Sequence, residues 1–236
     1  MNYRRLHELA EELEKHWNML HGLYLDSVIG FSLVHQRISN EQAFIREWLK
    51  DSDVANEDFQ DQCSFTYTTI FSKEFCASGI HSATQGEIKE RNRPGGLNWR
   101  TLGQMCIVSF YDYWNEYFRK EYAVAKGFID PSDNDQDKIR DILAKYVQDD
   151  FWGDMRILRI SIVHHRGIAV SEIKNCRLIK WFSEGDEINL SPEMMRQIFL
   201  AVLCWRNRIF SESLSKTTIR IPATSDEVVE EDRFVK

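Results

Sequence analysis

Residues that interrupt helices are scarce in this chain of 236 residues, which contains only 4 prolines and 11 glycines. Their scarcity leaves long stretches free to be helical, because proline breaks helices and glycine weakens them. No uninterrupted apolar run approaches the roughly 18 residues that a membrane-spanning helix needs. The first residues, MNYRRLHE, also lack the apolar segment of a secretory signal peptide. We therefore expect a cytoplasmic protein with no membrane partner.

Cysteines are few and are not arranged as a disulfide or zinc framework. The five cysteines, at positions 63, 76, 106, 176 and 204, are odd in number, widely separated and without a C-x-x-C pair. This pattern favours free thiols in a reducing compartment. The chain also lacks the phosphate-loop, G-x-G-x-x-G, G-x-S-x-G and H-E-x-x-H motifs. We expect neither a bound metal nor a cofactor.

Positive charge is in deficit, with 30 basic against 37 acidic residues and a formal net charge of −7. Such a balance excludes a protein that coats nucleic acid through bulk charge, but it is compatible with a local basic site.

The N-terminal region is predicted to be helical. Apolar residues recur with the 3.6-residue period of an amphipathic helix, and this stripe contains Leu6, Leu9, Ala10, Leu13, Trp17 and Leu20. A second helix is expected over 23–37. Ser39 and Gln42 have the spacing of a capping box that opens a third helix through Leu49. The acidic segment 51–62 is interpreted as a loop, and 63–80 remains undecided, with a short strand as one option.

The strongest break in the chain is the segment 92–96, with sequence NRPGG. It divides the chain into an N-terminal helical region and loop (1–93), a helical bundle (94–214) and an acidic flexible tail (215–236).

The region after this break is again helical, so the predicted fold class is all-α. Helices are expected over 101–126, 134–147 and 149–166, with Gly167 as the residue that ends the third. Asp130–Asp133 has the composition of a helix start. Ser191 and Pro192 open a last helix to about residue 213. A small β-hairpin is a further possibility near 178–190, around the turn Glu184–Asp186.

One stretch of this acidic chain is built to meet an anion. Residues 155–170 contain no acidic side chain, but they include Arg156, Arg159, His164, His165 and Arg166. Arginine offers a fixed fork of donors that suits phosphate, and histidine exchanges protons near neutral pH. The plain alternative is a solvated helix end, where cations are stabilised by about 0.3–1 kcal/mol through the helix dipole.

The segment 153–167 resembles the motif of HEPN domains (higher eukaryotes and prokaryotes nucleotide-binding), which is R-x4-6-H near the end of a core helix. Arg159 and His164 occupy the two motif positions. Upstream, the segment 111–119 (YDYWNEYFR) is similar to the first core helix of that family. The resemblance covers about residues 97–214 and implies a HEPN-like helical bundle with an N-terminal helical extension.

This resemblance implies metal-independent RNA cleavage by attack of a 2′-hydroxyl on the adjacent phosphate, which leaves a cyclic phosphate. His164 would be the general acid or base, and Arg159 would stabilise charge on the phosphorane. It also implies a C2 homodimer, a role in defence, toxin–antitoxin or stress systems, and a protein partner such as an antitoxin. Ile160 stands where active members usually carry a polar residue. The alternative is therefore an inactive HEPN module for dimerisation or for binding RNA, a nucleotide or a protein.

Secondary candidates surround this pair. Arg156 lies one turn before Arg159 and is a candidate second phosphate contact, and His165 and Arg166 are further secondary candidates. Asp112 and Glu116, four residues apart, either bind a cation, orient Arg159 or form an ordinary exposed acidic pair.

The spacing of the pair sets a geometric condition. An ideal helix turns about 500° over five residues, which leaves Arg159 and His164 about 140° apart. Either the helix loosens before Gly167, or two subunits combine their motifs in one cleft.

Overall fold

The computed structural model describes residues 1–50, 52–64 and 83–214. Within these ranges the regular elements are helices, and the only β pairing consists of two isolated bridges, Ser64–Thr84 and Ile168–Glu187. The prediction of an all-α fold is confirmed for the described residues. Most of the undecided stretch 63–80 and the whole tail 215–236 lie outside them.

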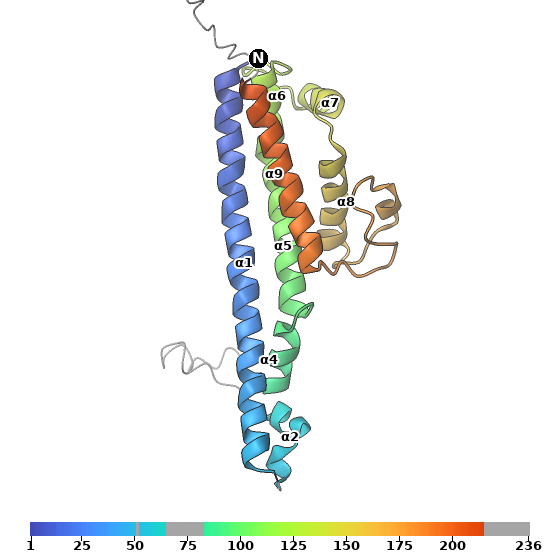
Figure 1. The fold of residues 1–236 in the computed structure, drawn as a ribbon. Helices are drawn as coiled ribbons and strands as arrows, with labels where there is room; N and C mark the ends of the chain where they lie inside the picture. The colour runs from blue at the N-terminus through green and yellow to red at the C-terminus, as the bar shows by residue number, and fades with distance from the viewer. Residues whose placement is uncertain (51, 65–82, 215–236) are drawn as a thin grey trace, which may run out of the picture.

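Helix α1 (Tyr3–Trp48) runs the length of a rod-shaped bundle, and the other helices lie to one side of it (Figure 1). The helices are α1 (Tyr3–Trp48), α2 (Glu57–Gln62), α4 (Gln85–Asn92), α5 (Leu97–Tyr113), α6 (Arg119–Lys126), α7 (Gln136–Tyr146), α8 (Asp150–His164) and α9 (Pro192–Leu214), with the 3₁₀ helices η1 (Asp53–Ala55) and η3 (Ser171–Asn175) and the π-helix η2 (Trp114–Phe118). None of the described helices is long and apolar enough to cross a membrane.

Helix α1 is a single helix of 46 residues, about 69 Å long at the usual rise per residue. The three separate helices predicted for this region are therefore wrong. Its start is capped by Asn2, whose side chain accepts a hydrogen bond from the Arg5 backbone N–H at 3.0 Å. One part of α1 packs against α5, α6 and α9, and another part packs against α2 and α4.

The capping box predicted at Ser39 and Gln42 is also wrong, because both residues lie inside α1. Gln42 is buried, donates to Asp61 at 2.7 Å and accepts from Lys89 at 2.8 Å. The predicted loop at 51–62 instead contains η1 and α2, and Asp61 on α2 supplies this contact. A buried amide thus joins three helices.

The apolar stripe of α1 lies in the main hydrophobic core, as its period predicts. Its residues Leu6, Leu9, Ala10, Leu13 and Leu20 are buried, and Trp17 packs against them. The same core contains residues from α5, η2, α6, α8 and α9. The division of the chain at 93/94 stays a prediction, but the first half of α1 and the bundle share one core.

Three tryptophans from three elements fill the centre of the bundle. Trp114 of η2 stacks on Trp152 of α8, with ring centroids 4.6 Å apart and an interplanar angle of 4°. Trp205 of α9 meets Trp114 edge-on at 4.5 Å. Offset stacking and edge contacts are the arrangements that aromatic rings favour, so these residues position η2 firmly against α8.

The helical rod predicted over 101–126 is present but begins earlier, at Leu97, and contains the π-helical turn η2. Helix α7 begins at Gln136 rather than at the predicted start, because Asp135 is the cap and accepts from the N–H groups of Asp137 and Lys138. Helix α9 begins as predicted, since the Ser191 hydroxyl accepts from the Met194 N–H at 3.2 Å.

The β-hairpin expected near 178–190 is absent from the structure. The turn at Gly185 does form, but its flanking backbone pairs with residues that follow α8. Ala169 N–H donates to Asp186 O at 2.8 Å, and Ile188 N–H donates to Gly167 O at 2.7 Å. The segment 185–188 therefore closes a loop against the end of α8.

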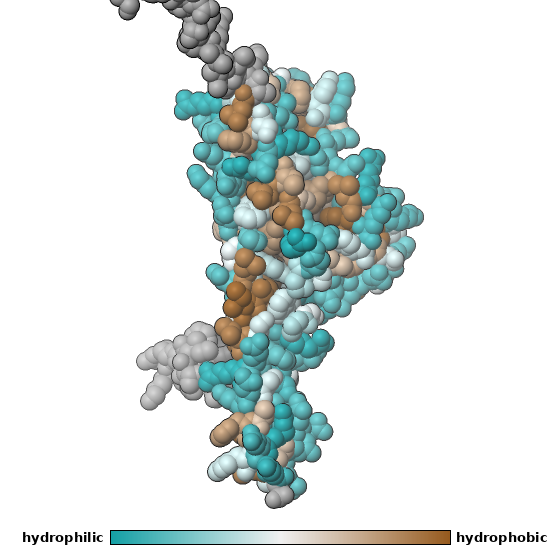
Figure 2. Space-filling model, viewed as in Figure 1, coloured by the Kyte–Doolittle hydropathy of each residue, from teal (hydrophilic) through white to brown (hydrophobic). Residues whose placement is uncertain are grey.

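The outer face of α1 is partly apolar. Figure 2 shows hydrophobic surface over the middle of this helix. Its exposed apolar residues include Met19, Leu23, Ile29 and Leu33, each more than half exposed.

Candidate functional site

Helix α8 ends at the motif predicted from the sequence. Its last helical residue is His164, and His165 has non-helical backbone angles. Arg166 and Gly167 follow with positive φ values of 55° and 80°, and the Gly167 N–H donates to the Ser161 carbonyl at 3.0 Å. Glycine suits this left-handed position because it has no side chain to clash. The helix thus stops where the candidate residues lie.

Arg159 and His164 contact each other directly within one chain. The Nη1 of Arg159 lies 2.9 Å from the Nε2 of His164. Because a guanidinium only donates hydrogen bonds, Nε2 accepts here and the imidazole proton sits on Nδ1. The spacing left two possibilities: a helix that loosens before Gly167, or two subunits that share one cleft. The structure shows the first, since α8 ends at His164 and the long Arg159 side chain reaches this residue within one chain. A second subunit is not needed to bring this pair together.

Asp112 of α5 holds Arg159 from the other side. The Nε of Arg159 donates to Asp112 Oδ1 at 3.3 Å. The side chain of Arg159 is 27% exposed and that of Asp112 is 43% exposed, while His164 is on the surface. A carboxylate, a guanidinium and an imidazole therefore form a chain that a large solvent-borne ligand can reach.

Glu116 does not join this chain. It is exposed and accepts a hydrogen bond from Asn115 Nδ2 at 2.7 Å. The π-helical turn separates it from Asp112, and a π turn needs more residues than an α turn, so residues four apart are displaced around the axis. Within the described part of the chain, no group of three or more His, Cys, Asp or Glu side chains could hold a metal ion.

The other cations of the motif lie on the surface around the pair. Arg156, His165 and Arg166 are all exposed. His165 lies near Glu172, whose pKa is lowered by hydrogen bonds from its own backbone and from Ser171 and by the charge of that histidine. Neither Arg156 nor Arg166 has a hydrogen bond or ion pair to a described residue. These two arginines keep their donors free for a ligand.

Two buried polar residues that sequence reasoning missed hold the loop beneath the site. Asp154 accepts hydrogen bonds from the backbone N–H groups of residues 177, 178 and 179. Ser161 accepts from the Val170 N–H at 3.2 Å and donates to the Ile157 carbonyl at 3.0 Å. The partners of Asp154 lie more than twenty residues further along the chain, and those of Ser161 are backbone groups, so no side-chain motif in the sequence points to either residue.

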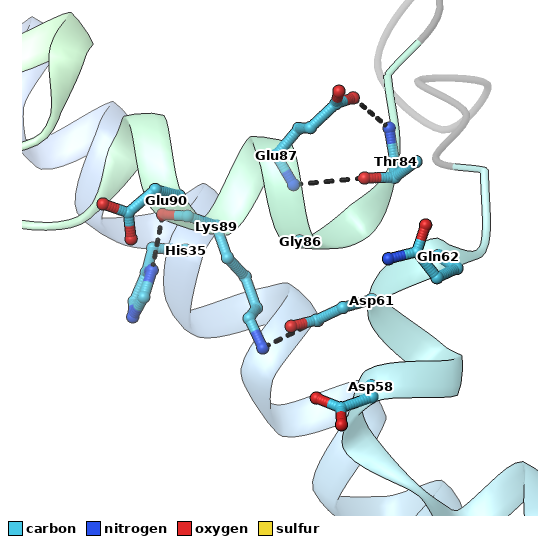
Figure 3. Close-up of a pocket in the computed structure, with 9 residues that line it drawn as sticks. All are labelled: His35, Asp58, Asp61, Gln62, Thr84, Gly86, Glu87, Lys89 and Glu90. Carbon is cyan, nitrogen blue, oxygen red and sulfur yellow. Dashed lines mark hydrogen bonds and ion pairs between the residues drawn. The ribbon is translucent and has the colours of Figure 1, made fainter.

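A hollow of about 510 Å³ lies between α1, α2 and α4, away from the α8 motif (Figure 3). Its contacts give it a structural role. Its Lys89 lies 2.9 Å from Asp61 and 3.0 Å from Glu57. Thr84 and Glu87 form a capping box at the start of α4, and the spacing T-x-x-E is visible in the sequence. The polar groups that line this hollow are largely engaged with one another.

No protein-family model, curated protein or solved structure matches this chain. The chemistry of the site must therefore be argued from its own side chains.

Proposed function

We propose that this protein is a metal-independent endoribonuclease that uses Arg159 and His164. The observation that supports the proposal is the 2.9 Å contact between Arg159 Nη1 and His164 Nε2 at an exposed helix end. Arginine and histidine together supply what cleavage of a phosphodiester requires, namely charge stabilisation and proton transfer. The resemblance to HEPN domains, carried by these same two residues, points to the same chemistry.

In the proposed reaction, the 2′-hydroxyl of RNA attacks the adjacent phosphorus. The O2′–P bond forms, the P–O5′ bond breaks, and the products are a 2′,3′-cyclic phosphate and a free 5′-hydroxyl. An incoming phosphate attracts the Arg159 guanidinium and so releases the Nε2 lone pair of His164 to accept the 2′-hydroxyl proton. The leaving 5′-oxygen takes a proton from a second histidine, which a symmetric dimer supplies, so one of the two histidines must be neutral and the other an imidazolium when the reaction begins. DNA has no 2′-hydroxyl and should not react.

The proposal includes a C2 homodimer with the end of α8 at its interface. Val163 and Ile168 flank His164 and are exposed apolar residues, and Met105 on the adjacent helix α5 is 60% exposed. The residue before Met105, Gln104, packs closely against Gly167: a Cβ atom added to this glycine would lie only 2.9 Å from Gln104 Nε2. An apolar rim around a basic centre is a surface that two copies can share. Sedimentation of the full chain tests this assembly.

A catalytically inactive module is the second candidate. Ile160 follows Arg159 and offers no polar group to a phosphate or a water molecule. In that case the same arginines would bind RNA, a nucleotide or a protein without turnover.

The test incubates the purified full chain with single-stranded RNA in the presence of EDTA. We expect cleavage by the unchanged protein and a loss of about 10²–10⁴-fold in His164→Ala, the usual contribution of a general acid or base. His7→Ala, which removes a partly exposed histidine of α1 outside the α8 motif, is the matched control and should cleave normally. Equal rates in all three proteins would refute the assignment. Saturable RNA binding that weakens in Arg159→Ala, without cleavage by any of them, would favour the inactive module.

A further inference from the structure

A cavity of about 700 Å³ lies beside the Arg159 site, between α8, α7 and the continuous rod formed by α5, η2 and α6. Its walls include the arginines Arg119 and Arg156, together with Tyr111, Trp114 and Trp152. Arg119 has no role in the cleavage proposed for Arg159 and His164, so the cavity that it lines is a candidate for a separate function.

The carboxylates that line this cavity already have donors. Asp149 accepts from the Phe151 N–H and from the Trp205 indole N–H, each within 3.0 Å. Asp150 pairs with Arg177 at 2.8 Å. Asp154, the third, accepts from the backbone of the 177–179 loop. Among the described residues, none of these three carboxylates has a hydrogen bond or ion pair to Arg119 or Arg156.

Arg119 and Arg156 have no carboxylate partner among the described residues. Among the described residues, Arg119 makes one hydrogen bond, from Nε to the Val147 carbonyl at 3.3 Å, and its two Nη groups have no acceptor there. Arg156 makes no hydrogen bond or ion pair to the described chain. The pKa of Arg119 is lowered, first by burial and then by the charge of Arg156, with Tyr111 acting in the opposite sense. Two close cations without a counter-charge are stabilised when an anion enters between them.

We propose that this cavity is a binding site for a phosphate group, held by Arg119 and Arg156. Two guanidinium groups with free terminal N–H donors match an anion that carries several oxygens, and arginine forks fit phosphate in bidentate geometry. The cavity is far larger than a phosphate ion, and Trp114, Trp152 and Ile157 line it. The phosphate should therefore belong to a larger molecule, either a small phosphomonoester or the terminal phosphate of an RNA strand.

Calorimetric titration of the full chain tests the site with three probes: inorganic phosphate, a 5′-phosphorylated oligoribonucleotide and the same oligonucleotide without the phosphate. We expect saturable binding of inorganic phosphate that weakens at least about tenfold in Arg119→Gln and in Arg156→Gln, since a hydrogen bond to a charged group typically contributes that much. If the phosphorylated oligonucleotide binds more tightly than both other probes, the RNA end is the natural source. If it binds no more tightly than phosphate, the source is a small phosphomonoester.

Two matched variants separate this site from other effects. Arg196→Gln removes an exposed arginine of α9 that pairs with Glu193, and it should leave phosphate affinity unchanged. His164→Ala should abolish RNA cleavage while phosphate binding in the cavity persists, so the two proposals fail independently. Arg156 is exposed, so its variant should fold even if the half-buried Arg119 proves necessary for stability. Absence of phosphate binding by the unchanged protein, or equal affinity in Arg156→Gln and Arg196→Gln, would overturn the proposal.

Discussion

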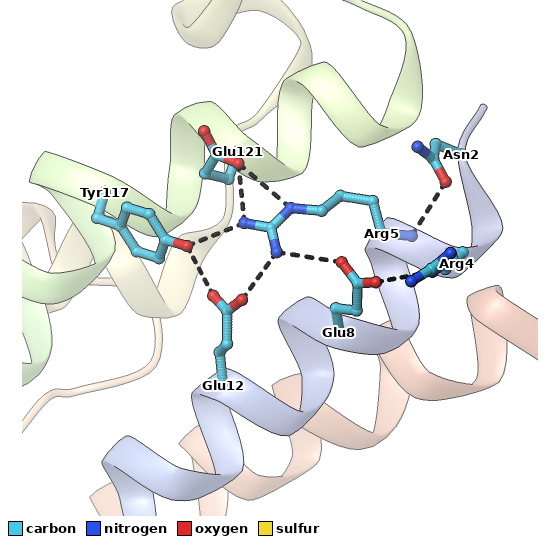
Figure 4. Close-up of polar contacts among 7 residues, drawn as sticks. All are labelled: Asn2, Arg4, Arg5, Glu8, Glu12, Tyr117 and Glu121. Atoms are coloured by element: carbon cyan, nitrogen blue, oxygen red, sulfur yellow. Dashed lines mark hydrogen bonds and ion pairs between the residues drawn. The ribbon is translucent and has the colours of Figure 1, made fainter.

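Arg5 and Arg159 are both arginines that join two helices, but their surroundings differ. Arg5 of α1 is surrounded by acceptors: it lies 2.7 Å from Glu12, 2.8 Å from Glu121 and 2.9 Å from the Tyr117 hydroxyl (Figure 4). Arg159 has one carboxylate, Asp112 at 3.3 Å, and one histidine. The first guanidinium has its charge and its donors matched by the protein, whereas the second does not.

This difference separates a structural arginine from one available for chemistry. The strong pairing of Arg5, which raises its pKa despite burial, ties the start of α1 to η2 and α6. A ligand would have to displace three carboxylates, those of Glu8, Glu12 and Glu121, to reach it. At Arg159 a phosphate needs only to displace a neutral imidazole, and this displacement frees the imidazole to act as a base.

Of the variants that test this comparison of two arginines, Arg159→Gln should have the largest effect. We expect RNA cleavage to fall by about 10²–10³-fold, the usual result of removing one donor that stabilises charge in a transition state. The thermal midpoint should change by less than about 2 °C, because a partly exposed ion pair contributes little to stability. Cleavage assays and thermal melts on the same sample check both parts. If the thermal midpoint of Arg159→Gln fell along with its cleavage rate, Arg159 would be a structural residue like Arg5, which would contradict the comparison.

Arg5→Gln should have the converse effect, with a loss of about 2 kcal/mol in the free energy of unfolding, because it leaves partly buried carboxylates without their cation. For a chain of this size the thermal midpoint should fall by about 4–8 °C. Cleavage per folded molecule should not change. Arg4→Gln is the control, since Arg4 is 91% exposed and its one ion pair to the described part of the chain is with Glu8. Equal melting of the two variants would contradict the comparison.

A smaller effect should appear in the pH dependence of stability. Burial raises the pKa of Glu12, but hydrogen bonds from Tyr117 and Arg5 outweigh it, so the folded pKa lies below the ordinary value of 4.5. The stabilisation from this carboxylate is therefore complete above the unfolded pKa and is lost as the pH falls through the folded pKa. Urea unfolding gives the free energy of unfolding of the unchanged protein and of Arg5→Gln. The difference between these two free energies should become smaller as the pH is lowered from about 7 to about 3. A difference that stays constant over this range would contradict the role of Glu12.

The parts of the fold that were predicted from the sequence are those with a strong local period. The apolar stripe from Leu6 to Leu20 and the cap at Ser191 needed no knowledge of distant residues. The single long α1 was missed because the helix continues past polar positions such as Gln42, which are stabilised by contacts with Asp61 and Lys89 far along the chain. The closing segment 185–188 was misassigned to a hairpin because its partner is 167–169, and the single bridge between Ile168 and Glu187 leaves no alternating pattern in the sequence.

The candidate site could be located from the sequence, but its geometry could not. A stretch without acidic residues pointed to Arg159 and His164, and the two do meet. The contact joins two residues of one helix that are five positions apart, and it is made by the long arginine side chain, which the angle between helix positions does not take into account. Arg159 pairs with Asp112 rather than with Glu116 because the π turn at Trp114–Phe118 displaces Glu116 around the helix axis. Asp154 and the cavity arginine Arg119 gave no signal, because their roles arise only from tertiary packing.

The central claim is that Arg159 and His164 cleave RNA by promoting attack of its 2′-hydroxyl on the adjacent phosphorus. The most direct test uses an oligoribonucleotide and a matched strand that carries one 2′-deoxy nucleotide at the cleavage position, both in EDTA, with the products identified by mass spectrometry. The account predicts a 2′,3′-cyclic phosphate from the first strand and no cleavage at the substituted position of the second. Cleavage of both strands at that position, or a product with a 5′-phosphate, would contradict it.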